Sequence, residues 1–330
     1  MKVLEQRIRE FARLVHSVRA RPDVTPLAGD ASARRYFRAS FPGDGESMVV
    51  MATRDTEEAD DFARITSLMR NLGVDTPQLY AQAGNLLAME DLGDRMLQDH
   101  AASLKGESLL NEYHRIIEEL VRFQLVSISQ IEKEADCYKM RFDGEKLRYE
   151  IDFAHAHFLK GWRKRQPSKA DMAAMDRQWD KVITRLAARM ECLAHRDFHS
   201  RNIMVSGGRR VWIDYQDARM GRLHYDLVSL IFDPYIDLGP ELEEDLREYY
   251  FTLLEAKGAA PWGHGEFLEL YWLSAAQRLY KALGTYGYQT TQKGSKVYLP
   301  YIKPAQERLI RICKENEALR QLGKLLGPLI

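Results

Sequence analysis

The sequence is poor in cysteine and has no excess of charge of either sign. It contains three cysteines, which lie far apart and form no CxxC pair: Cys137, Cys192 and Cys313. This spacing argues against a framework of disulfide bonds and indicates a reducing compartment. Lysine plus arginine and aspartate plus glutamate both number 48. Nucleic acid and anionic membranes are therefore not expected as main partners, because both require a basic surplus.

Long apolar runs are also missing. No stretch approaches the ~18–20 apolar residues that a membrane-spanning helix needs. Residues 1–15 are charged throughout and lack the apolar centre of a signal peptide. Hydrophobic residues make up 45% of the chain and charged residues 29%, as in an ordinary globular protein. We therefore expect a cytoplasmic enzyme or binding protein that uses neither membrane nor nucleic acid.

The pattern of apolar residues divides the chain near Gly93. Before this point, an amphipathic helix over 4–18 precedes short strand-like runs, which surround a second helix over 56–73. Thr56 is the predicted N-cap of that second helix, and Gly73 is its predicted stop. After Gly93 the periodicity is mainly helical. Helices are predicted over 107–128, 145–165, 169–191, 241–256, 264–283 and 302–320.

These patterns predict an α+β protein of two lobes. Residues 1–92 would form the N-lobe, a small antiparallel sheet with one helix. Residues 93–330 would form the C-lobe, which is larger and mainly helical. Because the connection between the lobes is short, they should meet closely and leave a cleft between them.

Polar residues concentrate in residues 193–221, LAHRDFHSRNIMVSGGRRVWIDYQDARMG, which otherwise have the pattern of buried strands. The GG dipeptide predicts a tight hairpin turn. A turn centred near Gly208 places Asn202 opposite Asp214, and antiparallel partners lie ~4.5–5.5 Å apart at Cα. Asp197 lies in the loop just before the hairpin. These oxygen groups suit Mg²⁺, a hard cation that retains waters and binds phosphate oxygens.

The arrangement matches the requirements of phosphoryl transfer. That reaction uses a loop aspartate to orient and deprotonate the attacking hydroxyl, and here Asp197 has this position. It also uses oxygen ligands for magnesium, and here these are Asn202 and Asp214. The match is specific, because the residue types, their spacing and the intervening hairpin must all occur together.

A metal-dependent hydrolase is the competing interpretation of the same loop. His195, Asp197 and His199 alternate along an extended segment and could bind one zinc or iron ion. Such a site needs a further ligand motif. His155 and His157 are spaced i,i+2 in a helical segment and therefore lie on different faces. We interpret His195 and His199 as structural residues that brace the loop.

The motifs resemble those of the aminoglycoside phosphotransferase and choline kinase superfamily, which has a protein-kinase-like fold. HRDFHSRN, IDYQDA and YDLVSL carry this resemblance. LAGDASARRYFR, MEDLGD and AAQRLYKALGTYGY narrow it to bacterial cell-wall amino-sugar kinases, which phosphorylate the anomeric hydroxyl of N-acetylmuramate and N-acetylglucosamine. The resemblance covers residues 25–310, most of the chain. It implies a bilobal kinase-like fold, ATP and Mg²⁺ as cofactors, Asp197 as catalytic base, and Asn202 and Asp214 as magnesium ligands.

The resemblance also implies a nucleotide site in the N-lobe. The turn with Gly29, Asp30 and Ser32 would cover the ATP phosphates with backbone N–H groups, with the cation of Arg34 behind it. The segment MEDLG would be the hinge between the lobes. Its backbone groups, in particular at Glu90 and Leu92, would hydrogen-bond adenine.

The third strand departs from the wider superfamily. Relatives carry a lysine there that binds the α- and β-phosphates and pairs with a helix glutamate, whereas SMVVMAT contains none. The amino-sugar kinase branch also tends to lack this lysine. An arginine oriented by Glu57 or Glu58 could replace it. The candidates are Arg34, Arg35, Arg38 and Arg54.

The C-lobe would bind the acceptor. In relatives a helical insert lines the acceptor pocket, and here that insert carries Glu150. Arg278 and Lys281 stand one turn apart on a helix and could meet a carboxylate such as the lactyl group of N-acetylmuramate, unless they are surface cations. Asp217 could hydrogen-bond sugar hydroxyls or cap the next turn. Asp226, in YDLVSL, is expected to anchor the backbone of the catalytic loop.

We therefore expect an ATP- and Mg²⁺-dependent kinase of a small molecule, with an amino sugar as the favoured acceptor. The alternatives are an aminoglycoside kinase, a choline-type kinase and a nucleotide-binding pseudokinase. An aminoglycoside site would need many acidic residues, and the acidic run ELEEDLREYY has the spacing of an exposed helix face. The missing strand lysine motivates the pseudokinase. The complete set of Asp197, Asn202 and Asp214 argues against it.

Overall fold

The computed structural model describes residues 2–17, 21–27, 34–43, 45–130 and 136–330. By packing, the chain divides into two compact units. The first unit contains Met1–His100 and Asn202–Gln216, and the second contains Ala101–Arg201 and Asp217–Ile330. The packing boundary thus falls at His100 rather than at residue 92. The hairpin that we expected in the C-lobe packs with the first unit.

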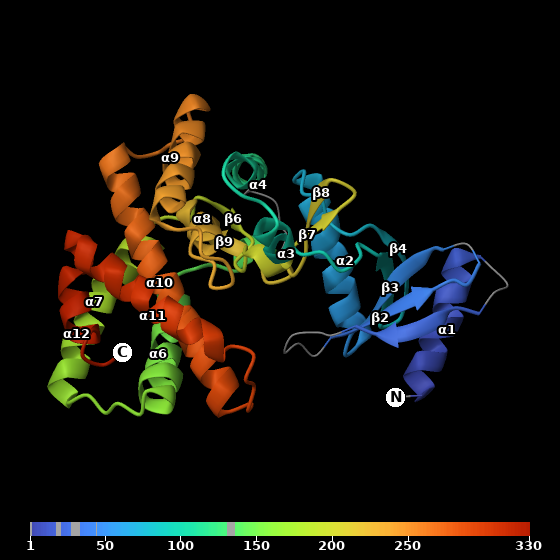
Figure 1. Cartoon of the computed structure of the whole chain (residues 1–330), viewed down its shortest axis with the longest axis horizontal. Coiled ribbons are helices and arrows are strands. Elements are labelled where there is room, and N and C mark those ends of the chain that lie inside the picture. The colour runs from blue at the N-terminus through green and yellow to red at the C-terminus, as the bar shows by residue number, and fades with distance from the viewer. Residues whose placement is uncertain (1, 18–20, 28–33, 44, 131–135) are drawn as a thin grey trace. The chain divides into compact units, whose positions relative to one another are not determined.

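The first unit is built on one antiparallel sheet with the strand order β1-β2-β3-β5-β4 (Figure 1). The strand-like runs predicted from the sequence are confirmed as β2 to β5, whereas β1 was not predicted. The strands are β1 (Asp23–Pro26), β2 (Arg35–Ser40), β3 (Ser47–Ala52), β4 (Leu79–Ala83) and β5 (Leu86–Glu90). The helices are α1 (Lys2–His16) and α2 (Thr56–Asn71), followed by α3 (Leu97–Ala102) at the end of the first long segment.

One face of this sheet is apolar and packs against α1. Ile8 and Phe11 of the helix share a buried cluster with Phe37, Val50 and Ala88, which come from three neighbouring strands. Because successive side chains in a strand point to opposite faces, the intervening residues lie on the other face of the sheet. Burial of the apolar face therefore determines which side chains of β2 are presented away from α1.

The N-cap of helix α2 lies one residue earlier than the sequence suggested. The N-cap is Asp55, whose carboxylate accepts a hydrogen bond from the backbone N–H of Glu58 at 2.9 Å. The prediction of Thr56 was wrong because aspartate and threonine are both favoured caps and stand side by side here. Gly73 follows the helix with a φ of 81°, the left-handed conformation expected of a helix stop.

Strands β7 (Ile203–Ser206) and β8 (Arg209–Trp212) form the predicted hairpin. Gly207 and Gly208 have φ angles of 56° and 78°, as the two central residues of a tight hairpin turn require. The turn is therefore centred between the two glycines, not on the second of them.

This shift changes the register at the open end of the hairpin. The backbone N–H of Ile213 donates a hydrogen bond to the carbonyl of Asn202 at 3.0 Å. The expectation that Asn202 lies directly opposite Asp214 is wrong by one residue. Both residues still lie at the same end of the hairpin, because the strand pairing ends at that point.

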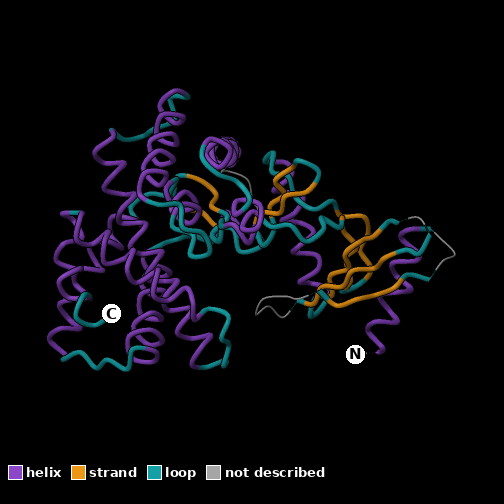
Figure 2. Tube along the Cα trace, viewed as in Figure 1, coloured by secondary structure: helices purple, strands orange, loops and turns teal. Residues whose placement is uncertain are grey.

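The second unit is mainly helical, and its strands are short (Figure 2). The predicted helices over 107–128 and 241–256 are confirmed. Among the residues that the structure describes, no helix is long and apolar enough to cross a bilayer. The helices are α4 (Glu107–Ile128), α5 (Asp136–Lys139), α6 (Gly144–Ala154), α7 (Lys169–Ala187), α8 (His224–Ile231), α9 (Pro240–Ala256), α10 (His264–Thr291), α11 (Leu299–Glu315) and α12 (Arg320–Leu326). The short elements are β6 (Cys192–Ala194), β9 (Arg219–Gly221), the π-helix η1 (His155–Trp162) and the 3₁₀ helices η2 (Ser200–Asn202) and η3 (Glu317–Leu319).

Several predicted helix ends in this unit are wrong. The helix predicted over 169–191 ends at Ala187, and the one predicted over 145–165 continues after Ala154 as the π-helix η1. The helix predicted over 302–320 ends at Glu315, where the side chain of Asn316 donates a hydrogen bond to the carbonyl of Ile312 at 2.8 Å. Helix α10, predicted over 264–283, continues through Gly284 and Gly287 to Thr291. A Cβ on Gly284 would lie 2.7 Å from Cα of Ala154, so glycine there permits close packing of α10 on α6.

Candidate active site

A buried carboxylate holds the loop that follows β6. Asp226, in the first turn of α8, accepts hydrogen bonds from the backbone N–H of His195 at 2.7 Å and of Arg196 at 3.0 Å. Arg196 has a φ of 84°, which non-glycine residues rarely adopt. The two hydrogen bonds stabilise this conformation and fix the loop that presents Asp197. The backbone contact is of the kind expected of Asp226.

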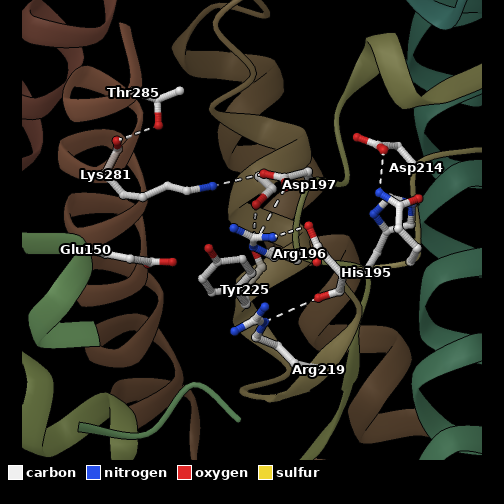
Figure 3. Close-up of polar contacts among 12 residues, drawn as sticks. Glu150, His195, Arg196, Asp197, Asp214, Arg219, Tyr225, Lys281 and Thr285 are labelled. Atoms are coloured by element: carbon white, nitrogen blue, oxygen red, sulfur yellow. Dashed lines mark hydrogen bonds and ion pairs between the residues drawn. The ribbon is translucent and has the colours of Figure 1, made fainter. Parts of the chain in front are cut away.

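Two cations from α10 hold Asp197. Lys281 Nζ lies 3.0 Å from Oδ1 of Asp197, and Arg278 Nη2 lies 3.4 Å from the same oxygen (Figure 3). The side chains of Arg278 and Lys281 are only 10% and 13% exposed, so the alternative that they are surface cations is wrong. Burial alone would raise the pKa of Asp197, but these cations and Arg196 hold it well below its usual value. Asp197 is therefore an ionised carboxylate near neutral pH.

Asp217 binds the third cation of this group. Arg196 Nη1 donates a hydrogen bond to Oδ2 of Asp217 at 2.6 Å, and Arg196 Nε lies 3.9 Å from Oδ2 of Asp197. The side chain of Asp217 thus orients an arginine beside the loop aspartate. Contact of Asp217 with sugar hydroxyls stays a prediction.

Glu150 is a buried carboxylate that α6 contributes to the same group. It is 3% exposed, and its Oε2 accepts a hydrogen bond from Nε2 of Gln277 at 2.9 Å. Its Oε1 lies 3.2 Å from Nζ of Lys146. Figure 3 shows the Glu150 side chain pointing toward Tyr225. Two helices therefore supply charged side chains on the Asp197 side of the second unit.

The two loop histidines differ in burial: His195 has no exposed surface, whereas His199 is half-buried. Desolvation lowers the pKa of His199 to about 3, although the nearby charge of Asp197 acts in the opposite direction. The ring of His199 packs edge-to-face on Tyr235, with 5.3 Å between the ring centres. Within the described part of the chain, the side chains with the spacing of a metal site lie elsewhere, at Asp152, His155 and Asp176. The geometry therefore gives no support to a hydrolase-type metal site on the loop.

The first unit carries the two expected magnesium ligands. Asp214 follows β8 with a φ of 63°, and its Oδ1 accepts a hydrogen bond from Nε2 of Gln216 at 2.7 Å. Asn202 precedes β7 and is 9% exposed. The hairpin thus brings an amide oxygen and a carboxylate to one end. These donors fit Mg²⁺, which prefers oxygen ligands of this kind.

Arg34 has the contact expected of a replacement for the missing lysine. Its Nε lies 3.1 Å from Oε1 of Glu58 in α2, and the two side chains are 15% and 20% exposed. Burial raises the pKa of Tyr36, and the charges of Arg34, Asp214 and Glu58 all act on it, so these groups surround one ring. The other three candidates bind elsewhere: Arg35 lies over Phe37, Arg38 pairs with Asp91 and Asp94, and Arg54 pairs with Asp55.

The other expected nucleotide contacts are only partly described. The backbone N–H of Glu90 donates to the carbonyl of Gln78 at 2.8 Å, and the side chain of Glu90 pairs with Arg209. Leu92 packs in a small apolar cluster with the β7–β8 hairpin. Their contact with adenine stays a prediction. Three predicted residues lie outside the described ranges: Gly29, Asp30 and Ser32.

Two residues of this group were not singled out from the sequence. Arg196 and Tyr225 each stand next to a residue that was, since they precede Asp197 and Asp226 directly. Their position next to Asp197 and Asp226 in the chain was the one signal in the sequence that could have indicated them. It could not show that Arg196 turns back onto Asp197, or that Tyr225 is buried with only 4% of its surface exposed.

A fixed loop aspartate, an asparagine and an aspartate on a hairpin, and a half-buried arginine–glutamate pair are the parts of a phosphoryl-transfer enzyme. Comparison with known families agrees. The chain belongs to the phosphotransferase enzyme family, whose family model matches residues 23–262.

Individual relatives are also similar over most of their length. N-acetylmuramate/N-acetylglucosamine kinase of Neisseria meningitidis serogroup B is 30% identical over 317 residues, which cover 93% of this chain and 91% of the relative. The kinase of the same name from Pseudomonas aeruginosa is 25% identical, over 93% of this chain and 88% of the relative.

Solved structures show the same fold. A choline/ethanolamine kinase family protein from Mesorhizobium loti superposes with a TM-score of 0.62 at 15% identity, covering 99% of both chains. The ADP-bound aminoglycoside phosphotransferase APH(2'')-Ib superposes with a TM-score of 0.58 at 15% identity, covering 96% of this chain and 97% of that one. The α+β, kinase-like fold expected from the sequence is therefore confirmed.

Proposed function

We propose that this chain is an ATP- and Mg²⁺-dependent kinase that phosphorylates the anomeric hydroxyl of N-acetylmuramate and N-acetylglucosamine. The observation that carries the proposal is Asp197, an ionised carboxylate on a loop that Asp226 fixes through two backbone hydrogen bonds. The names of relatives that match 93% of this chain support the choice of acceptor. The enzyme would act in the cytoplasm, in the recycling of cell-wall amino sugars.

Asp197 would orient the acceptor hydroxyl and accept its proton as the new bond to phosphorus forms. Because Asp226 holds the loop backbone, the carboxylate needs little rearrangement before the reaction. The transition state of phosphoryl transfer is loose, so positioning and charge neutralisation supply most of the acceleration. Lys281 and Arg278 would supply part of that positive charge on the acceptor side.

The first unit would bind the nucleotide. Asn202 and Asp214 would hold a magnesium ion, which neutralises phosphate charge when bound. Arg34, oriented by Glu58, would bind phosphate oxygens in place of the missing lysine. Backbone groups of the remaining predicted residues would complete the site: Gly29, Asp30 and Ser32 at the phosphates, and Glu90 and Leu92 at adenine.

The charge around Asp197 favours an amino sugar over the other acceptors. An aminoglycoside is a polycation and choline a quaternary ammonium ion, and both need carboxylates or aromatic rings around the acceptor. Here three cations surround Asp197: Arg196, Arg278 and Lys281. An N-acetylated sugar, neutral or bearing a carboxylate, is compatible with this surplus. The pseudokinase is disfavoured because Asp197, Asn202 and Asp214 are all present.

The test is ADP release by the purified full chain, with and without Mg²⁺, against a panel of acceptors. The panel contains N-acetylmuramate, N-acetylglucosamine, other hexoses, kanamycin and choline, and each product is assayed for loss of its reducing end. We expect Mg²⁺-dependent turnover of the N-acetylated amino sugars with loss of the reducing end, and none with Asp197→Asn. Turnover only of kanamycin or choline, or a product that keeps its reducing end, would overturn the proposal.

A further inference from the structure

A buried hydroxyl without a hydrogen-bond partner among the described residues lies near Asp197. Tyr225 is 4% exposed, and among the described residues its Oη has no hydrogen-bond partner. Leaving a buried polar group unsatisfied lowers the stability of the folded state, and the great majority of buried polar groups are therefore hydrogen-bonded. The fold itself gains nothing from this hydroxyl, because a phenylalanine would fill the same space without that cost.

The ring that carries this hydroxyl is held firmly. Phe142 stacks on it, with 4.1 Å between ring centres and 26° between ring planes. The backbone N–H of Tyr225 donates a hydrogen bond to the carbonyl of Arg222 at 3.1 Å. Tyr225 also immediately precedes Asp226, the residue that fixes the catalytic loop. Packing of the ring and its position next to Asp226 therefore place the hydroxyl close to the loop.

The surroundings of the hydroxyl are those of the proposed acceptor site. Figure 3 shows Glu150 pointing toward Tyr225, with Arg196 next to the ring and Asp197 beyond Arg196. Burial and the nearby charge of Glu150 raise the pKa of Tyr225 well above its usual value, so the hydroxyl keeps its proton. Tyr225 is thus an uncharged donor in a group of side chains that otherwise carry full charges.

We propose that Tyr225 is a specificity-determining residue whose hydroxyl donates a hydrogen bond to the acetamido carbonyl of the acceptor. The inference rests on the proposed function for the identity of the acceptor. An amide carbonyl only accepts hydrogen bonds, and it is matched by a neutral donor. The charged groups suit the rest of such a molecule: Glu150 accepts from sugar hydroxyls, and Lys281 and Arg278 bind a carboxylate where one is present.

The substitution Tyr225→Phe tests this role, because it removes one oxygen atom and keeps the ring. We expect kcat/KM for N-acetylglucosamine to fall about 10–100-fold, because the acetamido carbonyl loses its hydrogen bond in the buried site, with the KM for ATP unchanged. The midpoint of thermal unfolding should stay the same or rise, since an unsatisfied hydroxyl has been removed. If Tyr225 had only a structural role, the Tyr225→Phe variant would not lose activity while its unfolding midpoint stayed the same.

Tyr271→Phe is the matched control. Tyr271 is fully buried, and within the described part of the chain its hydroxyl also has no partner, but its ring packs against Phe267 and Trp272, with Arg247 over its face. This variant should leave the kinetics of both substrates unchanged. Equal kinetics of wild type and Tyr225→Phe on every acceptor would overturn the inference.

Glucose, which lacks the acetamido group, tests the assignment to the carbonyl. The ratio of kcat/KM for N-acetylglucosamine to that for glucose should fall in Tyr225→Phe. An equal loss on both sugars would overturn that assignment. The proposed function fails on a different result, namely wild-type enzyme that does not phosphorylate N-acetylated sugars, so the two failures are distinguishable.

Discussion

Lys281 Nζ lies 3.0 Å from Oδ1 of Asp197, so a buried ammonium binds the carboxylate that we propose as the base. The two residues are 84 positions apart in the chain and belong to a helix and a loop. Burial lowers the pKa of Lys281, and the charge of Asp197 opposes this effect. Each group therefore favours the charged form of the other.

The first prediction concerns the pH dependence that this pair sets. Lys281 lowers the pKa of Asp197, so Lys281→Met should raise that pKa. Because the base must be deprotonated, the acidic limb of kcat/KM should move to higher pH, and it is measured by ADP release between about pH 4 and 8. Lys281→Arg, which keeps the charge, should leave the limb in place. Lys303→Met, at a lysine that is 83% exposed, is the control. A limb that does not move in Lys281→Met would contradict the role.

The second prediction concerns acceptor charge. Arg278 contacts Asp197 and donates to Oγ of Ser229 at 3.1 Å, and a carboxylate on the acceptor would compete for this guanidinium. Arg278→Ala should therefore raise the KM for N-acetylmuramate about tenfold more than the KM for N-acetylglucosamine, which has no carboxylate. Steady-state kinetics of wild type and Arg278→Ala on both sugars measure these KM values. The same increase on both would mean that Arg278 acts only through Asp197.

The third prediction concerns the pair that replaces the strand lysine. Arg34 is held by Glu58 at 3.1 Å, so Glu58→Gln should loosen the arginine. We expect the KM for ATP to rise about tenfold while the KM for the sugar stays constant, because a fixed cation binds phosphate more tightly than a mobile one. Arg54→Gln provides the comparison, since that side chain is 75% exposed. If Arg54→Gln raised the KM for ATP as much as Glu58→Gln does, the assignment of the phosphate-binding role to Arg34 would be wrong.

The fourth prediction concerns the metal. Asp214→Asn replaces a charged ligand by a neutral one, so the Mg²⁺ concentration for half-maximal activity should rise about tenfold or more. A titration of activity with Mg²⁺ measures it. Asp94→Asn, at a carboxylate of the same unit that is 80% exposed, should behave as wild type. An unchanged Mg²⁺ requirement in Asp214→Asn would remove this residue from the metal site.

The fifth prediction concerns stability in acid. His224 has no exposed surface, packs against Trp262 and Phe267, and burial lowers its pKa from 6.5 to about 3. Between these two values the unfolded chain binds a proton that the folded protein does not. The free energy of unfolding therefore decreases as the pH falls below about 6.5, by about 1.4 kcal/mol per pH unit for the one proton that His224 binds in the unfolded chain.

His224→Phe keeps an aromatic ring in this place and removes the titration. Urea unfolding at a series of pH values should show a shallower loss of stability in the variant than in wild type below about pH 6. Parallel curves for the two proteins would show that His224 is protonated in the folded state as readily as in the unfolded chain.

The sequence predicted local features more reliably than distant contacts. Helix α4 follows from periodicity alone, because the burial of one helix face imposes a period of 3.6 residues. Strand β3 follows from a short apolar run next to a loop rich in proline and glycine. The errors occur where two local signals compete. Asp55 and Thr56 are both good caps, and Gly284 has the chemistry of a helix stop until its packing against Ala154 is known.

What the sequence determined by itself is the class of chemistry. The spacing of Asp197, Asn202 and Asp214 around a glycine turn lies within one short stretch, so chain connectivity alone brings these residues near one another.

The surroundings of Asp197 were decided only by the tertiary structure. Arg278 and Lys281 come from a helix 81 and 84 residues further along, and sequence spacing gives no measure of such a distance. Their place follows from how closely α10 approaches α6 at Gly284, which depends on packing between helices. For the same reason, only the folded chain shows that the hydroxyl of Tyr225 is buried beside the loop without a partner among the described residues.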